Sequence, residues 1–455
     1  MRVLLVQPYT FTIRGLPQIP LALMYIGGRI EKNGHTVKIL DRNVETNARR
    51  MIEDFRPDVL GVTSLTGKMI LDGIRISRYV RKRFPETTIV WGGVHASTLP
   101  EATLQEDFID YLVVGEGEES FAELLSAIEN GGELSTIPGI AYKSDDGLRI
   151  NPRRPFIKDL DSISFVPWHL IDPRRYLKYE TLFITSRGCP HQCAFCYNEK
   201  FNMRRWRAMS PGRVKEEIDY ASRFHPVRRF RFDDDNFCVD RNRFHGILDI
   251  LPRDVPLYFE SRVDYIDEEF CRHVAEFRDA FVFLGVESGD DAILKRMKKD
   301  ITVDQIRNAY ALINRYNIKT SGSFVIGSPG ETREALQRTL CLLEEIRPTR
   351  PSCCIFVPFP GSLFTEDLIQ SGGLANIQTL SDWGAFTDSE YAGAKQYSEI
   401  TNDELNKIYR RFWRQFVWNF VSELRLTWIL AGIQNLGINY WRTLSRTLNR
   451  DLPCR

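Results

Sequence analysis

Apolar residues in the first 130 positions come in short β-branched runs that alternate with longer stretches at helical spacing. The runs lie at Val3 to Val6, Thr36 to Leu40, Asp58 to Thr63, Thr88 to Trp91 and Tyr111 to Val114. Strands that alternate with helices form βα units, whose strands pair in parallel and carry helices on both faces. The pattern therefore predicts an N-terminal, doubly wound, Rossmann-like α/β domain.

This alternation stops near residue 131, where glycines and prolines become frequent. Gly131-Gly132 and Val166-Pro167 are examples, and residues 136–179 are typical of a linker between domains. Alternation resumes with strand candidates at Thr181 to Ser186, Arg229 to Phe232, Pro256 to Glu260, Phe281 to Val286, Ser321 to Ile326 and Ser352 to Val357. Six βα units are fewer than the eight of a closed barrel. We therefore expect a first domain in residues 1–135 and a partial barrel in residues 180–370.

Residues 371–455 form a C-terminal region with a different pattern. Apolar residues recur at helical spacing from Leu405 to Leu424, and residues 405–455 hold nine basic against two acidic side chains, a local charge of +7. The pattern predicts an amphipathic helical region. Its charge-free run, Leu426 to Trp441, is shorter than the roughly 20 apolar residues of a membrane span, so we expect no transmembrane helix. Three roles of this region remain open: it could form a lid on the barrel, dock on a membrane surface, or dock an acidic protein substrate.

Composition narrows the class of protein. The chain has 455 residues, 43% hydrophobic and 27% charged, which is typical of a soluble globular protein with two or three domains. A formal net charge of +1 gives no whole-chain argument for a nucleic-acid partner. The apolar run at the N-terminus is too short for a signal peptide, and we expect a cytoplasmic protein.

Three of the nine cysteines lie close together, directly after a predicted strand. Cys189, Cys193 and Cys196 have the spacing Cys-x3-Cys-x2-Cys, whereas the other six are scattered. Three thiolates can hold three irons of a [4Fe–4S] cluster and leave the fourth iron open to a substrate. The alternative is a structural zinc site, with His191 or Cys238 as its fourth ligand.

Polar or glycine-rich segments follow the predicted strands, at the end where ligands of parallel α/β folds bind. In the second part of the chain these segments are Asp233 to Phe237, Glu260 to Asp264, Gly285 to Gly289 and Gly327 to Glu331. In the first part they are Thr63 to Gly67, Gly92 to His95 and Gly115 to Glu118. A mononucleotide pocket would explain the glycines of the first part equally well.

In order and position, these segments resemble those of cobalamin-binding radical S-adenosylmethionine (SAM) enzymes. The cysteine run, with Phe195 directly before its last cysteine, and the four later segments resemble the radical SAM domain, which implies a partial (βα)6 barrel. The first part of the chain resembles a cobalamin-binding domain. The residues that carry this resemblance are Pro20-Leu21, Gly34 to Val37, Asp41, Trp91 to His95 and Val114 to Glu118. The corrinoid pattern Asp-x-His-x-x-Gly is absent, because Asp41-Arg42-Asn43-Val44 has no histidine. Cobalt would then lack a histidine ligand, with the dimethylbenzimidazole tail displaced and loop atoms or water at its lower face.

The resemblance also implies which residues hold each cofactor. Cys189, Cys193 and Cys196 would hold the [4Fe–4S] cluster. The residues for SAM would be Phe195, Asp234, Asp235, Asn236, Arg262, Glu287, Ser288, Gly327, Pro329 and Gly330. Those for cobalamin would be Ser64, Leu65, Thr66, Gly92, Gly93, Val94, His95, Gly115, Glu116, Gly117 and Glu118. Catalytic residues beyond the cofactors are not identified.

The activity implied is that of a class B radical SAM methyltransferase, which methylates an unactivated carbon and spends two SAM molecules per turnover. The cofactors carry the difficult chemistry, and the protein aims them. A low-potential flavodoxin or ferredoxin type of donor would supply electrons. The substrate would be a protein residue, such as the glutamine of methyl-coenzyme M reductase, or a hydrophobic small molecule. The alternatives are a cobalamin-dependent cyclase or ring-rearranging enzyme, and a non-catalytic corrinoid or redox sensor.

Overall fold

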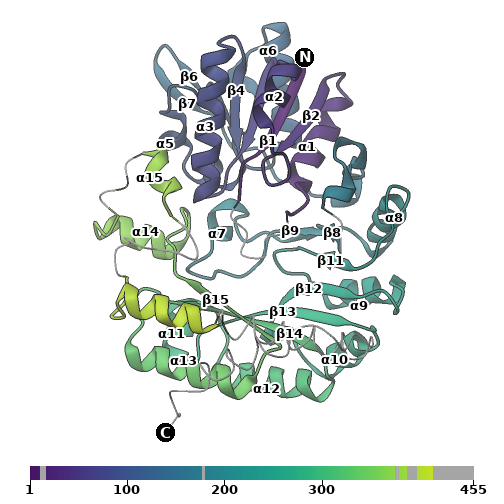
Figure 1. Ribbon diagram of the computed structural model, residues 1–455, viewed down its shortest axis with the longest axis vertical. Coiled ribbons are helices and arrows are strands. Elements are labelled where there is room, and N and C mark those ends of the chain that lie inside the picture. Colours follow the sequence, from purple (N-terminus) through teal and green to yellow (C-terminus); the bar gives the residue numbers. More distant parts are fainter. Residues whose placement is uncertain are drawn as a thin grey trace, which may run out of the picture.

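The structure is a computed structural model that describes residues 1–10, 17–176, 180–374, 377, 379–386, 397–412 and 414. A mainly parallel sheet lies above a second, fully parallel one, and helices flank both sheets (Figure 1). The loops at the strand ends of both sheets meet in the space between them. This arrangement confirms the predicted α/β class.

The upper sheet contains the five predicted strands, β1 (Arg2–Gln7), β2 (Thr36–Asp41), β3 (Val59–Thr63), β4 (Thr88–Gly92) and β5 (Tyr111–Val113), all parallel. Its strand order is β2-β1-β3-β4-β5-β6-β7. Helices on its two faces are α1 (Leu21–Glu31), α2 (Ala48–Phe55), α3 (Lys68–Arg83), α4 (Gly93–Thr98), α5 (Pro100–Leu104) and α6 (Gly117–Asn130). The β-branched runs supply the fully buried strand residues, as expected for a sheet covered on both faces.

Residues 136–179 are more than the linker that the sequence predicts. They include β6 (Ile140–Ser144) and β7 (Gly147–Ile150), which extend the upper sheet in antiparallel fashion. Asp145-Asp146 closes the hairpin between them, so a turn signal that indicated a linker marks a hairpin instead. Four short 3-10 turns precede or follow these strands at Leu134–Thr136, Leu160–Ser162, Trp168–Leu170 and Pro173–Arg175.

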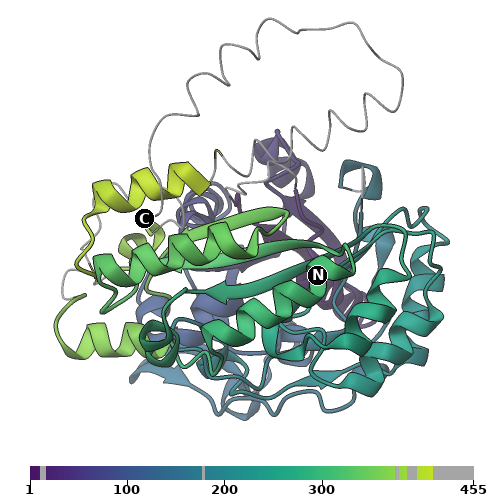
Figure 2. The ribbon, with the colours of Figure 1, turned by 90° about the horizontal axis from the view of Figure 1, so that it is seen from below.

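The lower sheet has six parallel strands in the order β15-β14-β13-β12-β11-β8, as in the expected partial barrel. They are β8 (Thr181–Phe183), β11 (Phe230–Phe232), β12 (Leu257–Arg262), β13 (Ala280–Glu287), β14 (Lys319–Ile326) and β15 (Arg350–Ile355). Helices cover its outer face, as the view from below shows (Figure 2), namely α8 (Pro211–Ala221), α9 (Arg241–Ile250), α10 (Glu268–Ala275), α11 (Asp291–Arg296), α12 (Val303–Arg315) and α13 (Arg333–Ile346). Its core is rich in stacked phenylalanines, among them Phe232 and Phe237.

Short elements lie between β8 and β11, in the segment that holds the three cysteines. Strands β9 (Ser186–Arg187) and β10 (Arg207–Ala208) pair in antiparallel fashion, and α7 (Asn198–Phe201) directly follows the last cysteine. A 3-10 turn, Val263–Tyr265, follows β12. The segment therefore runs along the upper edge of the lower sheet, where it faces the N-terminal domain (Figure 1).

The C-terminal region returns to both domains. Helix α14 (Leu363–Gln370) follows β15, and α15 (Leu380–Gly384) packs on α3, where Gly67 N donates to Trp383 O at 3.1 Å. Residues 402–412 are helical, and Phe412 contacts Phe324 of β14. Residues 415–455, which hold most of the expected basic helical region, lie outside the described residues.

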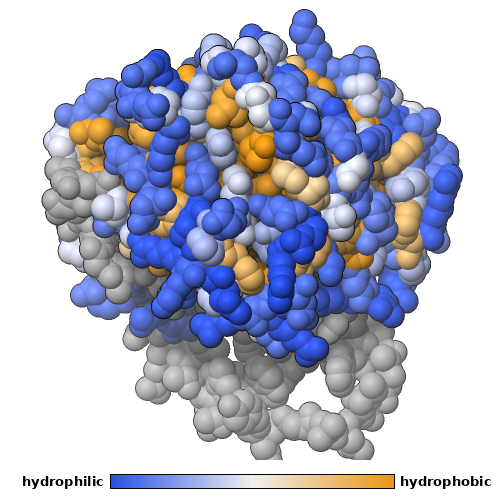
Figure 3. All heavy atoms as spheres, turned by 90° about the horizontal axis from the view of Figure 1, so that it is seen from above, coloured by the Kyte–Doolittle hydropathy of each residue, from blue (hydrophilic) through white to orange (hydrophobic). Residues whose placement is uncertain are grey.

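Within the described part of the chain, none of the helices combines the length and the apolar character that crossing a bilayer requires. On the face seen from above, polar side chains cover most of the surface, with small groups of apolar residues between them (Figure 3).

Candidate functional site

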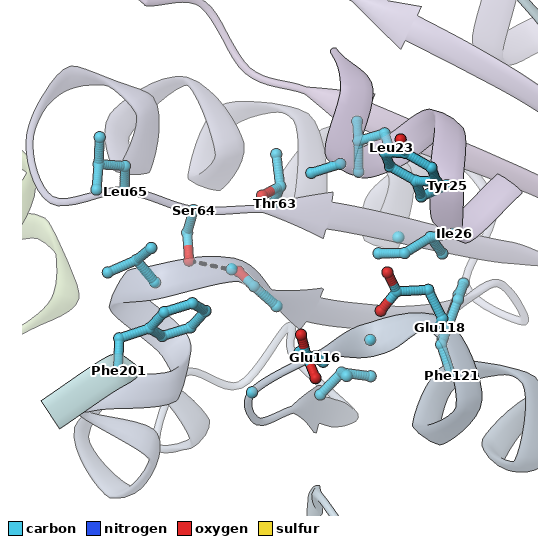
Figure 4. Close-up of a pocket in the computed structure, with 18 of the residues that line it drawn as sticks. Leu23, Tyr25, Ile26, Thr63, Ser64, Leu65, Glu116, Glu118, Phe121 and Phe201 are labelled. Atoms are coloured by element: carbon cyan, nitrogen blue, oxygen red, sulfur yellow. Dashed lines mark hydrogen bonds between the residues drawn. The ribbon is translucent and has the colours of Figure 1, made fainter. Parts of the chain in front are cut away.

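A cavity of about 460 Å³ lies between the two domains. The strand ends of the upper sheet and the cysteine-bearing segment of the lower one line it. Nine of the eleven residues predicted for cobalamin contribute to its wall: Ser64, Leu65, Gly92, Gly93, Val94, Gly115, Glu116, Gly117 and Glu118. In Figure 4, Leu23, Ile26 and Phe121 lie at one end of the cavity, and Leu65 and Phe201 at the other.

The local structure explains why this wall needs glycine. Gly93 has a φ of +86°, and a Cβ there would lie 2.7 Å from the backbone N and O of Ser64. The two loops are also tied by Ser64 Oγ, which donates to Gly92 O at 2.7 Å. Backbone walls with an apolar recess suit a large, flat ligand that carries an aromatic base, so the residues present fit cobalamin.

Two of the residues predicted to bind cobalamin, Thr66 and His95, lie outside the cavity wall. His95 is 1% exposed, and its Nδ1 lies 2.9 Å from Thr66 Oγ1. Its ring also meets Trp383 edge-on at 6.0 Å, and neither His95 nor Thr66 lines the cavity. Burial lowers the pKa of His95 to about 3, so the imidazole is neutral. The structure thus places both residues behind the cavity wall, where the pair stabilises the loop, and we expect no contact between His95 and cobalt.

Replacing His95 by glutamine tests this assignment. The variant is expected to bind cob(II)alamin with an unchanged electron paramagnetic resonance spectrum, because no histidine nitrogen is lost from cobalt. Its unfolding midpoint should fall, since a buried ring and its hydrogen bond to Thr66 are replaced by a smaller group. Loss of nitrogen hyperfine structure in the variant would contradict the assignment.

Glu116 and Glu118, whose carboxylates point into the cavity region in Figure 4, bind arginines of the lower domain. Arg187 donates to Glu116 at 2.8 Å and to Glu118 at 2.6 Å. Arg207 donates to the same Glu116 at 2.9 and 3.0 Å. Burial alone would raise the pKa of Glu116, but the two arginines hold it below its usual range. The ion pairs of Glu116 and Glu118 with these arginines tie the two domains together.

The three cysteines of the predicted cluster site lie together beside the cavity. Their thiols interact electrostatically, and burial raises the pKa of Cys189 and brings that of Cys196 to about 12. Such thiols ionise when a metal binds them. Asn236 Nδ2 lies 3.9 Å from Cys189 Sγ, and Arg262 Nη1 lies 3.8 Å from Cys193 Sγ. Donors aimed at thiolate sulfurs fit an iron–sulfur cluster.

The arrangement does not support the zinc alternative. No group of three or more His, Cys, Asp or Glu side chains in the described ranges could hold one metal ion. A cube places each thiolate on a different iron, so its three ligands need not converge. His191 Nε2 is bonded to Tyr265 at 2.9 Å, and Cys238 is buried with its thiol bonded to Ser261. Neither proposed fourth ligand is available.

The three consecutive aspartates after β11 do not all point to the same side of the chain. Asp233 and Asp235 line the cavity, and burial raises the pKa of Asp235 to about 6. Asp234 is 1% exposed and accepts hydrogen bonds from Thr185 N, Thr185 Oγ1 and Ser186 Oγ at 2.6 to 2.8 Å. It holds the end of β8, and these bonds occupy the carboxylate that was predicted to accept from the SAM ammonium.

Arg262 and Glu287 belong to a buried charged group beside Cys193. Arg262 also bonds Asp264, and Glu287 forms an ion pair with Lys299 at 2.6 Å. Burial would lower the pKa of Lys299, but Glu287 and Cys193 raise it, so Lys299 stays charged. A register shift in β13 and a φ of +63° turn Glu287 towards this group. Sequence analysis missed Lys299, because nothing in Lys298-Lys299 shows which lysine is buried.

The other residues predicted for SAM lie around the end of β14 and the cluster segment. Phe195 packs against a small apolar cluster. Gly327 and Gly330 have φ values of +75° and +80°, as a loop that exposes its backbone requires, and Pro329 lies between them. Ser288 is fully buried, and its Oγ bonds Thr339 and Asp290 N. It therefore braces its loop, and its predicted contact with SAM stays a prediction.

The loop of Gly327 and Gly330 also contains Glu331, a buried carboxyl group whose Oε1 has no hydrogen-bond partner among the described residues. Burial raises its pKa from 4.5 to about 7. The folded state therefore holds this proton more tightly than the unfolded state. The resulting stability is complete below pH 4.5 and is lost as the pH rises through 7.

We expect the apoprotein to lose up to about 3 kcal/mol of unfolding free energy from this group between pH 5 and 8. The variant Glu331→Gln, which cannot ionise, should lose correspondingly less over that range. Urea unfolding of both proteins at several pH values measures the difference. Parallel pH profiles for the two proteins would contradict the prediction.

Comparisons with known proteins agree with this geometry. The chain matches the Radical SAM superfamily over residues 183–343 and the B12 binding domain over residues 12–125. It is 30% identical over 434 residues to an uncharacterized methyltransferase, PH0819, of Pyrococcus horikoshii, covering 91% of this chain and 92% of that protein. It is 27% identical over 413 residues to the anaerobic magnesium-protoporphyrin IX monomethyl ester cyclase of Rubrivivax gelatinosus, covering 86% and 73%.

One solved structure shares the fold across both domains. The radical S-adenosylmethionine methyltransferase TsrM from Kitasatospora setae superposes with a TM-score of 0.69 at 21% identity, over 82% of this chain and 77% of that one.

Proposed function

Because this chain belongs to the B12-binding radical SAM proteins, we propose that it is a cobalamin-dependent methyltransferase that acts on an unactivated carbon. One observation carries the proposal. The segment that holds the three cysteines also forms part of the wall of the cobalamin cavity, through Arg187, Gly188 and Tyr197. A radical formed at the cluster and a methyl group held on cobalamin would thus meet in one cavity.

The cofactors are a [4Fe–4S] cluster, SAM and cobalamin. When bound, they supply an electron, an oxidising radical and a methyl group, which side chains cannot supply. The chain holds and orients them. Cys189, Cys193 and Cys196 would bind the cluster, while Asp235 and Asn236 offer acceptors to the ammonium group of SAM.

The carboxylate of SAM needs a cation near the cluster. Two buried cations, Arg262 and Lys299, lie beside Cys193 and provide a positively charged environment for this carboxylate. Arg262 presents a guanidinium fork, but part of that fork is already bonded to Asp264. We therefore assign the carboxylate to the space between both cations.

A cyclase that uses the same cofactors without transferring methyl is the second candidate. The similarity to the Rubrivivax cyclase supports it, but identity is higher and coverage of the relative more complete for the methyltransferase of Pyrococcus. For the substrate we retain a protein residue or a hydrophobic small molecule. For the electron donor we retain a flavodoxin or ferredoxin type of protein.

Anaerobic reconstitution with iron, sulfide and cobalamin tests the proposal. The protein is incubated with reductant and SAM deuterated at its methyl group, and 5′-deoxyadenosine and cobalamin-bound methyl are quantified by mass spectrometry. Formation of both supports a methyltransferase, and the label can then be followed into candidate substrates. If 5′-deoxyadenosine forms while cobalamin acquires no labelled methyl, the cyclase becomes the better assignment. Absence of both products favours a sensor.

A further inference from the structure

The cobalamin cavity and the cluster segment are connected by a buried ion-pair network of Arg187, Arg207, Glu116 and Glu118 (the bridge network). We propose that the bridge network couples the two cofactor sites, so that filling the cluster site strengthens cobalamin binding and filling the cobalamin site strengthens retention of the cluster. Arg187 and Arg207 thereby act as positioning residues. The inference rests on the proposed presence of both cofactors.

The position of Arg187 makes such coupling mechanically direct. It lies two residues before Cys189, on β9, and only Gly188 separates the two. Its two terminal nitrogens reach different carboxylates, Nη1 that of Glu116 and Nη2 that of Glu118. Glu116 directly precedes α6 and Glu118 lies in its first turn, and both form part of the cavity wall. A shift of this wall is therefore transmitted to the first cluster ligand.

Arg207 completes the network from the neighbouring strand. In the β9–β10 pair it lies directly opposite Arg187. Its Nη1 donates to both oxygens of Glu116 and to Ile157 O, and Ile157 N in turn donates to Glu116 Oε2. Arg207 does not line the cavity, so a change there leaves the cavity wall intact.

Burial and charge balance indicate that the network forms as one unit. The side chains of Glu116, Glu118 and Arg207 are 10 to 11% exposed, and that of Arg187 is 19% exposed. Two positive charges face two negative ones, and the ring of Tyr25 covers the Arg187 guanidinium at 5.7 Å. Removing one member leaves a buried charge without its partner, which is costly. The cavity wall and the cluster segment are thus held together through the whole network at once, as coupling requires.

The bonding pattern makes the two arginines respond differently to the same conservative change. The hydrogen bonds of Arg207 in the described structure pass through one nitrogen, Nη1, while its Nε and Nη2 are buried without a hydrogen-bond partner there. The single ammonium group of lysine can take over the bonds of this one nitrogen. Arg187 needs two nitrogens in a fork, which lysine does not have. Arg207→Lys should therefore preserve the coupling, and Arg187→Lys should abolish it.

The experiment measures hydroxocobalamin binding to the full chain by anaerobic absorbance titration, with the cluster reconstituted and with iron removed by a chelator. For the natural sequence we expect the dissociation constant to be about tenfold lower with the cluster present, within the usual range of site-to-site coupling. The ratio should fall to about one in Arg187→Lys and Glu118→Gln, and stay near tenfold in Arg207→Lys. Reciprocally, iron release to a chelator should be slowed by cobalamin in the natural sequence and unaffected by it in Arg187→Lys.

Glu119→Gln is the matched control, because Glu119 is the next residue in α6 and pairs with Arg29 inside the same domain. It should keep the tenfold ratio. Glu118→Gln preserves side-chain shape and hydrogen-bonding capacity, so it keeps the test valid if Arg187→Lys does not fold. An unchanged ratio in both Arg187→Lys and Glu118→Gln would overturn the inference, as would a ratio of one in the natural sequence. If the natural sequence binds hydroxocobalamin in neither state, both this inference and the proposed function are overturned.

Discussion

Replacing Cys193 by alanine is expected to abolish formation of 5′-deoxyadenosine, a loss of at least a thousandfold. Cys193 is the middle of the three clustered thiols, and it is the one that Arg262 Nη1 approaches at 3.8 Å. With two thiolates left, the site cannot hold a cube by the three irons that three cysteines provide. Iron and sulfide content of the reconstituted variant should fall together with product formation, which mass spectrometry measures.

Cys341→Ala is the control for this experiment. Cys341 lies on α13 and is exposed, so the change removes one thiol without touching the cluster site or the core. It should retain both iron and 5′-deoxyadenosine formation. A Cys193→Ala variant that still carries about four irons per chain and cleaves SAM would refute the assigned ligand set.

The second large effect is expected at Gly188, where alanine should prevent cluster incorporation although every cysteine remains. Gly188 has a φ of +83°, and a Cβ there would lie 2.0 Å from Arg205 O. Real contacts of this kind do not exist, so the segment that leads into Cys189 must move. Its bond from Gly188 N to Asp235 at 3.1 Å would be lost with it. The positive φ alone costs about 1 to 2 kcal/mol for alanine.

Gly212→Ala provides the comparison, because a Cβ at that helical position meets only Ser210 Oγ at 3.8 Å, an ordinary contact. The measurement is the absorbance of the reconstituted cluster per folded chain, with folding followed by circular dichroism. Gly212→Ala should match the natural protein, whereas Gly188→Ala should bind less than a tenth of its cluster. Equal cluster content in the two variants would show that the close approach to Arg205 is relieved without cost.

The sequence predicts the strands and the general position of the site well, because both depend on neighbours in the chain. Short β-branched runs and the polar residues that directly follow them are local features, and parallel pairing gathers them at one edge. The hairpin of residues 140–150 was not predicted, because its second strand is exposed throughout and lacks an apolar run. Residues 415–455 lie outside the described part, so the three interpretations of the basic region stay predictions.

Side-chain roles were harder to predict, and the reasons differ. Arg187 and Glu116 are 71 residues apart, so only the docking of the domains reveals their ion pair. His95 had no local sign that Trp383 would cover it. The different position of Asp234 could have been predicted, because side chains alternate along an extended segment and Asp233 and Asp235 share the cavity side. Of the three aspartates, two thus line the cavity and one bonds the end of β8.

The contact of α15 with α3 has a consequence for how the protein is made. Trp383 covers His95 and accepts a hydrogen bond from Gly67, so the N-terminal domain lacks part of its cover until residues 380–384 have been synthesised. A ribosome adds roughly 5 to 20 residues per second, and about 300 residues separate the two contact points, so the delay is some 15 to 60 seconds. During that interval, the loop of Gly67 and the Thr66–His95 pair are exposed to chaperones and to solvent. Cobalamin that arrives early would meet a cavity whose outer support is still missing.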